Sequence, residues 1–175
     1  MEHTDDHLKR ILGDVEYLID EAEALSYVID AVPVGEKAAG VESMMEMLAL
    51  IDHAQLSYYR PLIEQLYSVP EVDEHPQDFR SSFKQLNETN AAPGNDKQEV
   101  KELLRQIAEN RRGLLTFVQE LPLRDLRVQG SINGTSQSIA DLLEEMVIFE
   151  RKQLKSIAER ILSLDNTMKP GRGQS

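Results

Sequence analysis

The stretch Ser138–Ile161, SIADLLEEMVIFERKQLKSIAERI, decides the fold. Its apolar residues recur at intervals of three and four, which places them on one face of an α-helix. Ser138 and Asp141 resemble a capping box with Asp in place of Glu, so we predict that the helix opens at Ser136 or Ser138. The inward face of this helix carries one stripe of residues: Leu142, Met146, Phe149, Gln153, Ile157 and Ile161.

The same periodicity recurs in three other stretches, which we predict as helices: residues 6–32, 42–67 and 97–121. Pro33 and Pro122 end the first and the third of these helices. Pro61 lies inside the second, where it lacks an N–H and its ring presses on the carbonyl of Ser57. We therefore expect a kink at Pro61, or a break that puts Pro61 in the first turn of a new helix.

The connector between the second and third helices is long and covers residues 68–97. Within it, Phe79, Phe83 and Leu86 have helical spacing and predict a short helix that covers the bundle. A connection of this length does not suit a simple hairpin. It suits a crossover that brings the third helix back parallel to the second.

The remaining segments indicate loops and a tail. Residues 34–40 and the polar stretch 124–135, with its Asn133-Gly134 turn, predict loops, and no alternating strand pattern is visible. The sequence therefore predicts an all-α fold: one four-helix bundle domain over residues 1–165, followed by a flexible polar tail over residues 166–175.

Composition limits the partners. The chain has 175 residues with 19 basic and 31 acidic side chains, a net charge of −12 and no cysteine. A negative field of this size repels phosphate backbones, so we expect no nucleic-acid partner. The start of the chain is polar and acidic, and no apolar stretch approaches the ~20 residues of a membrane span. We therefore expect no membrane partner and a cytoplasmic location.

Two stretches resemble the DinB/YfiT-like family of metalloenzymes. Residues 43–52, SMMEMLALID, follow the family pattern of Ser or Thr, two variable residues, Glu, and apolar residues that lead to a ligand histidine. Residues 138–157 follow its capped Leu-Leu run, which leads to His-Glu-x-x-His in the family. The resemblance covers most of the chain and implies a four-helix bundle in up-down-down-up order, with the long crossover between helices two and three.

The family's metal lies between three imidazoles, with a fourth coordination place open. The matching positions hold Leu50, Phe149 and Gln153. Leucine and phenylalanine have no lone pair to give, and a neutral amide is a poor ligand for a transition metal. Glu150 matches the family's Glu and, without the histidines beside it, we interpret it as part of a solvated face. We expect no cofactor; the alternative is a divalent transition metal such as zinc or nickel.

In this region of the sequence, His53 is the one candidate metal ligand, and it is a weak candidate. It lies one turn beyond Leu50, so a shifted alignment would make it the surviving ligand, facing Gln153 across the bundle. The other interpretation, which we favour, is a partly buried histidine whose nitrogens bond to protein or water, because a lone histidine rarely holds a metal. Which of Leu50 and His53 matches the family's ligand position stays open.

Arg111 falls where the third helix should be apolar. It could orient a carboxylate-bearing small molecule in a cavity between the helices. The residues of this candidate cavity are Leu50, His53, Arg111, Phe149 and Gln153. Alternatively, Arg111 extends to the rim of the bundle and pairs with a Glu of a neighbouring helix, which we favour because arginine is seldom fully buried.

Two functional hypotheses follow from the resemblance. In the first, the chain is a non-catalytic DinB-like protein that has lost the metal site and acts by binding a small molecule or by self-association, for example as a homodimer. In the second, it is a transferase that acts with a low-molecular-weight thiol, either without metal or with a reduced metal site that uses His53. We favour the first hypothesis.

Overall fold

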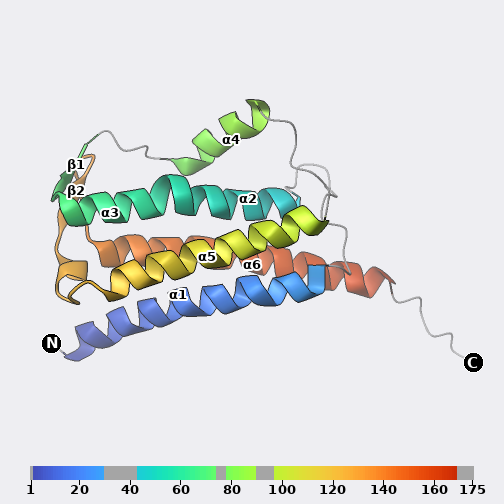
Figure 1. Cartoon of the computed structure of the whole chain (residues 1–175), viewed down its shortest axis with the longest axis horizontal. Coiled ribbons are helices and arrows are strands. Elements are labelled where there is room, and N and C mark those ends of the chain that lie inside the picture. Colours follow the sequence, from blue (N-terminus) through green and yellow to red (C-terminus); the bar gives the residue numbers. More distant parts are fainter. Residues whose placement is uncertain (1, 30–42, 74–77, 90–96, 169–175) are drawn as a thin grey trace, which may run out of the picture.

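The computed structural model describes residues 2–29, 43–73, 78–89 and 97–168, and these residues are mostly helical. The long helices lie side by side along the long axis of the molecule (Figure 1). They are α1 (Glu2–Val28), α2 (Met44–Ala54), α3 (Arg60–Ser68), α5 (Lys97–Gln119) and α6 (Ile139–Met168). Helix α1 packs against α5 and α6, and α2 packs against the same two helices from the other side, so the apolar core lies between them.

The second predicted helix is one continuous helical segment with a π-helical turn, η2 (Gln55–Tyr59), between α2 and α3. The N–H of Arg60 bonds to the carbonyl of Gln55, five residues back instead of four. Pro61 then lies in the first turn of α3, where its missing N–H costs little. Its place in a first turn agrees with one of the two alternatives, but the expected break before it is replaced by the π-turn. The wider π-turn therefore accommodates Pro61 without a break in the helical path.

Side-chain caps fix the starts of α2 and α6. The N–H of Glu46 donates to Ser43 Oγ at 3.1 Å, and the N–H of Ser43 donates to Glu46 Oε2 at 2.8 Å. At α6, the N–H of Asp141 donates to Ser138 Oγ at 3.2 Å, and the N–H of Ser138 donates to Asp141 Oδ2 at 2.8 Å. The predicted capping box at Ser138 is therefore confirmed, and the helix begins directly after it.

The fold also contains a small sheet that the sequence analysis did not predict. Strand β1 (Glu71–Val72) pairs in parallel with β2 (Gly130–Ile132), and β2 pairs antiparallel with β3 (Thr135–Gln137). The Asn133-Gly134 turn that joins β2 and β3 has positive φ at both residues, as a tight hairpin requires. The expectation of a plain loop over 124–135 was wrong, because strands of two or three residues are too short to show alternation.

The short helix predicted in the connector is α4 (Phe79–Thr89), which packs on α2. Phe79 and Phe83 pack against the core, whereas Leu86 is exposed. Helix α6 continues to Met168, beyond residue 165, where the domain was expected to end. The predicted loop over 34–40 and the tail from residue 169 lie outside the described residues.

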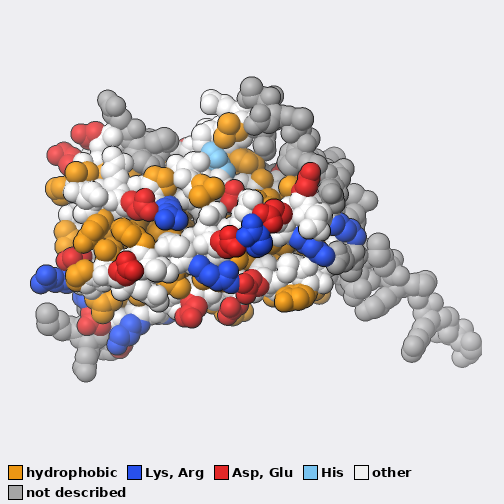
Figure 2. Space-filling model, viewed as in Figure 1, with side chains coloured by type: hydrophobic (Ala, Val, Ile, Leu, Met, Phe, Trp, Pro, Cys, Tyr) orange, Lys and Arg blue, Asp and Glu red, His pale blue; other side chains and the backbone are white. Residues whose placement is uncertain are grey.

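Two properties of the surface bear on partners. Acidic and basic side chains are interspersed over the face shown in Figure 2, and several of them pair, as Arg60 does with Glu64 and Arg112 does with Glu23. The net negative charge is therefore not gathered into one acidic patch on this face. Within the described ranges, no helix is long and apolar enough to cross a bilayer.

Alanine substitutions at two glycines should change the free energy of unfolding in opposite directions. Gly134 has a φ of +79°, where a Cβ atom is strained, although nothing lies within 4 Å of a Cβ added there. We predict that Gly134→Ala lowers the free energy of unfolding by about 1 kcal/mol. Gly13 lies inside α1 with the same open space, so Gly13→Ala should raise the free energy of unfolding by up to about 1 kcal/mol. Urea unfolding measures the change for each variant. If Gly134→Ala stabilised the protein as Gly13→Ala does, the positive φ assigned to Gly134 in the hairpin would be contradicted.

Candidate functional site

A fully buried ion pair lies at the centre of the helices. Arg111 of α5 and Glu150 of α6 both have side chains with 0% exposure. Arg111 donates from Nε to Glu150 Oε2 at 2.6 Å, and its Nη2 lies 2.5 Å from the same oxygen. The expectations that Glu150 lies on a solvated face and that Arg111 extends to the rim were therefore wrong. The expected pairing of Arg111 with a Glu of a neighbouring helix occurs, but inside the core.

The ion pair is joined to the two remaining long helical segments. Gln55, in the π-turn η2, donates from Nε2 to Glu150 Oε1 at 2.7 Å. Arg111 Nη1 donates to the backbone carbonyl of Leu18 in α1. The network therefore links α1, η2, α5 and α6 through one carboxylate and one guanidinium. Gln55 Oε1 is a buried atom without a hydrogen bond among the described residues. Arg111 Nη2 makes no separate hydrogen bond there either, but its short distance to Glu150 Oε2 places it within the ion pair.

Burial dominates the electrostatics of this centre. Burial raises the pKa of Glu150, and the opposing influences are the charge of Arg111 and the hydrogen bonds from Gln55 and Arg111. Tyr59, also buried, donates to Glu145 Oε1 at 3.3 Å. Burial and the nearby carboxylates raise the pKa of Tyr59, so its hydroxyl stays protonated and acts as a donor.

The three residues that the resemblance matches to the family's ligand positions are all buried. Leu50 and Phe149 belong to the apolar core, and Gln153 is buried on α6, one turn beyond Phe149. The ring of Phe149 packs edge-on against Phe79 of α4, with ring centroids 4.9 Å apart. Arg80 covers the outer face of the Phe149 ring at 5.2 Å. Because Leu50 and Phe149 offer no donor atom, these positions do not fit the metal that the resemblance implies.

The structure places His53 away from this centre, at the contact between α2 and α4. Its Nε2 lies 2.9 Å from Ser82 Oγ of α4, and its Nδ1 lies 3.4 Å from Ser57 Oγ. The ring packs against Phe83 at 5.6 Å. His53 thus links α4 to α2 instead of facing Gln153. In the described part of the chain, no three His, Cys, Asp or Glu side chains gather where one metal ion could bind them all.

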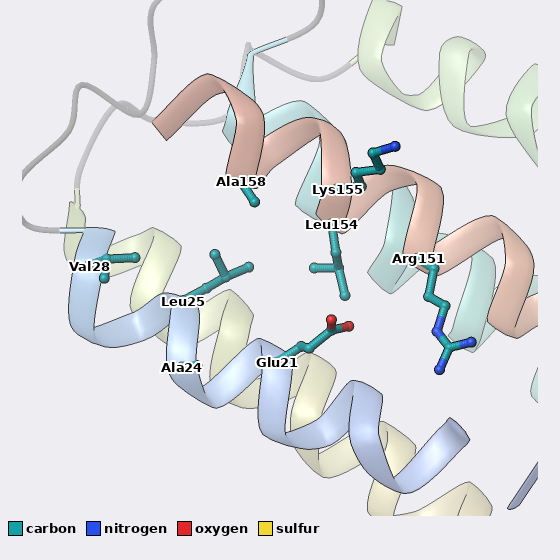
Figure 3. A pocket seen from close by; sticks show the side chains of 8 residues that line it. All are labelled: Glu21, Ala24, Leu25, Val28, Arg151, Leu154, Lys155 and Ala158. Carbon is teal, nitrogen blue, oxygen red and sulfur yellow. The ribbon is translucent and has the colours of Figure 1, made fainter. Parts of the chain in front are cut away.

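A groove between α1 and α6 is the feature that the sequence analysis missed. It has a volume of about 550 Å³ and is lined from α1 by Glu21, Ala24, Leu25 and Val28, and from α6 by Arg151, Leu154, Lys155 and Ala158. Leu25 and Leu154 point into it from opposite sides, and the carboxylate of Glu21 lies at one end (Figure 3). The signal in the sequence was the alanine on each helix, since a short side chain leaves space between helices.

No family model, no curated protein and no solved structure matches the chain. The likeness to the DinB/YfiT-like family therefore rests on the two stretches quoted above, and the chemistry of the site must be inferred from its own residues.

The buried ion pair should show strong coupling. Arg111→Met or Glu150→Leu leaves a buried charge without its partner, and we predict that each lowers the free energy of unfolding by about 3–5 kcal/mol. The double variant removes both charges, so its free energy of unfolding should fall by less than that of either single variant. Urea unfolding of the four proteins gives the coupling energy. Additive losses would contradict the pairing, and Arg105→Met in the exposed contact with Glu102 should change stability far less.

His53 should titrate below its ordinary range. Burial lowers the pKa of His53 from 6.5, although the charge of Asp52 opposes this. Between the folded pKa and 6.5 the unfolded chain binds more protons, so the free energy of unfolding should rise with pH through that window. NMR titration of the His53 ring, in the folded chain and in urea, measures both pKa values. A folded value at or above the unfolded one would contradict the burial of the His53 ring.

Proposed function

We propose that the protein is a non-catalytic member of the DinB/YfiT-like family that binds a small molecule in the groove between α1 and α6. In this proposal the fold is a four-helix bundle in up-down-down-up order. Support for that order comes from the chain directions in Figure 1, where α5 runs the same way as α2 and α3, while α1 and α6 run the other way. Helix α4 then belongs to the crossover between the second and third helices of the bundle.

The absence of catalysis in this proposal rests on how the centre of the bundle is filled. Leu50 and Phe149 occupy positions where the family has imidazoles, and both are part of the apolar core. Glu150, which matches the family's Glu, is bonded to Arg111 and Gln55. A substrate could reach these groups only by breaking a buried ion pair, which is costly.

The observation that carries the binding role is the groove itself. Its volume of about 550 Å³ falls in the range of about 300–1,000 Å³ that is usual for sites of small ligands. The middle of the groove is apolar, with Leu25, Val28 and Leu154 around it (Figure 3). An apolar ligand that displaces water from these side chains gains about 25 cal/mol for each Å² buried.

Self-association is the second candidate, favoured by one observation. Leu162, one turn beyond Ala158 on α6, is 63% exposed, and Val28 at the groove is also exposed. A second copy of the chain could cover these side chains and form a homodimer. Sedimentation equilibrium distinguishes this candidate, because a dimer through this face would weaken when the groove is blocked.

Blocking the groove should abolish binding of an apolar probe. We predict that 1-octanol shifts the methyl NMR signals of Leu25, Val28 and Leu154 in the unchanged chain. Ala158→Trp, which fills the groove from α6, should remove these shifts. Ser156→Trp is the matched control, since Ser156 is exposed on the same helix and does not line the groove. Shifts that persist in Ala158→Trp, or that spread over the whole surface, would contradict the proposal.

Restoring two histidines should not restore a metal site. We predict that Phe149→His combined with Gln153→His binds no stoichiometric zinc or nickel, because Leu50 still occupies the third ligand position. Equilibrium dialysis followed by elemental analysis measures the uptake. Stoichiometric binding would show that His53, and not Leu50, matches the family's ligand position.

A further inference from the structure

One oxygen in the groove has no partner. Glu21 Oε2 is a buried side-chain atom without a hydrogen bond among the described residues. Glu21 lies on α1, and Figure 3 shows its carboxylate pointing into the space between α1 and α6, close to Leu154. A carboxylate oxygen that is shielded from water and lacks a donor is a ready acceptor for a group that brings its own N–H.

The basic residues of the groove do not neutralise this carboxylate. Arg151 donates from Nη2 to Asp14 Oδ1 at 2.6 Å, so its charge is already paired. The side chain of Lys155 is 78% exposed and pairs at 3.8 Å with Glu159. In Figure 3 the Lys155 ammonium points away from the groove. The charge that faces the apolar middle of the groove is therefore the negative charge of Glu21.

We propose that the ligand of this groove is an amphiphilic amine: a small molecule with an ammonium group and an apolar chain or ring. Its ammonium group donates to Glu21 Oε2, and its apolar part packs on Leu25, Val28 and Leu154. This inference rests on the proposed binding role of the groove and adds the chemical class of the ligand. A second copy of the chain as occupant is the competing outcome.

Three matched probes test the class of the ligand. Octylamine, 1-octanol and octanoate share one apolar chain and carry a positive, a neutral and a negative head group near pH 7. Isothermal titration calorimetry should give octylamine at least about a tenfold lower Kd than 1-octanol, which is the size expected for a hydrogen bond to a charged group. Octanoate should bind most weakly, because Glu21 repels it.

Two variants test whether Glu21 causes the preference for octylamine. Glu21→Gln keeps the shape of the side chain and removes its charge, so octylamine should lose about tenfold in affinity and approach 1-octanol. This variant should remain folded, which circular dichroism checks, since it removes an unpaired charge. Asp20→Asn makes the same change of charge at the neighbouring exposed position and should leave the preference for octylamine intact.

The outcomes distinguish a failure of the amine proposal from a failure of the proposed binding role of the groove. Equal binding of octylamine and 1-octanol, tightest binding of octanoate, or an unchanged preference in Glu21→Gln would overturn the amine proposal and leave the binding role standing. No binding of any probe would overturn both. A dimer that dissociates in Ala158→Trp, measured by sedimentation equilibrium, would assign the groove to a second copy and overturn the amine proposal.

Discussion

The contact between Arg111 and Glu150 is the constraint on which the rest of the structure depends. Both charged side chains are fully buried. A buried ion pair is stable only when its geometry is good and its remaining polar atoms have hydrogen-bond partners. Those partners come from Gln55 in η2 and from the carbonyl of Leu18 in α1. A shift of any one long helix along its neighbours would break at least one of these bonds. The ion pair therefore fixes how the four helical segments lie against one another, while the apolar side chains around it supply most of the stability.

This arrangement explains why the centre of the molecule and the groove on its surface differ in structure. The π-turn directs Gln55 and Tyr59 inward, and both bond to carboxylates of α6. Phe149 and Leu50 fill the space around them. The hydrogen bonds of this centre therefore hold the helical segments together. The groove between α1 and α6 is different, because its apolar middle is open and one carboxylate oxygen at its end has no partner.

Local signals in the sequence predicted the helices well, and they failed where a contact is made between distant residues. The capping pattern at Ser138 and the position of Pro61 act within a few residues, so both could be inferred from the chain alone. Glu150 was misread because charge alone suggests solvent, although Met146 and Leu154, each four residues away, are buried on the same face. The parallel pairing of β1 with β2 joins segments about sixty residues apart, and no local pattern encodes it. The groove was missed because it depends on how closely α1 and α6 approach.

The most direct test of the central claim is the rate at which the guanidinium protons of Arg111 exchange with deuterium, followed by ¹⁵N NMR. If the ion pair is sealed between the helices, the Nε–H of Arg111 should exchange only when the structure opens, far more slowly than that of Arg124, whose side chain is 86% exposed. Exchange of Arg111 as fast as that of Arg124 would contradict the account, since it would mean that water reaches the centre of the molecule.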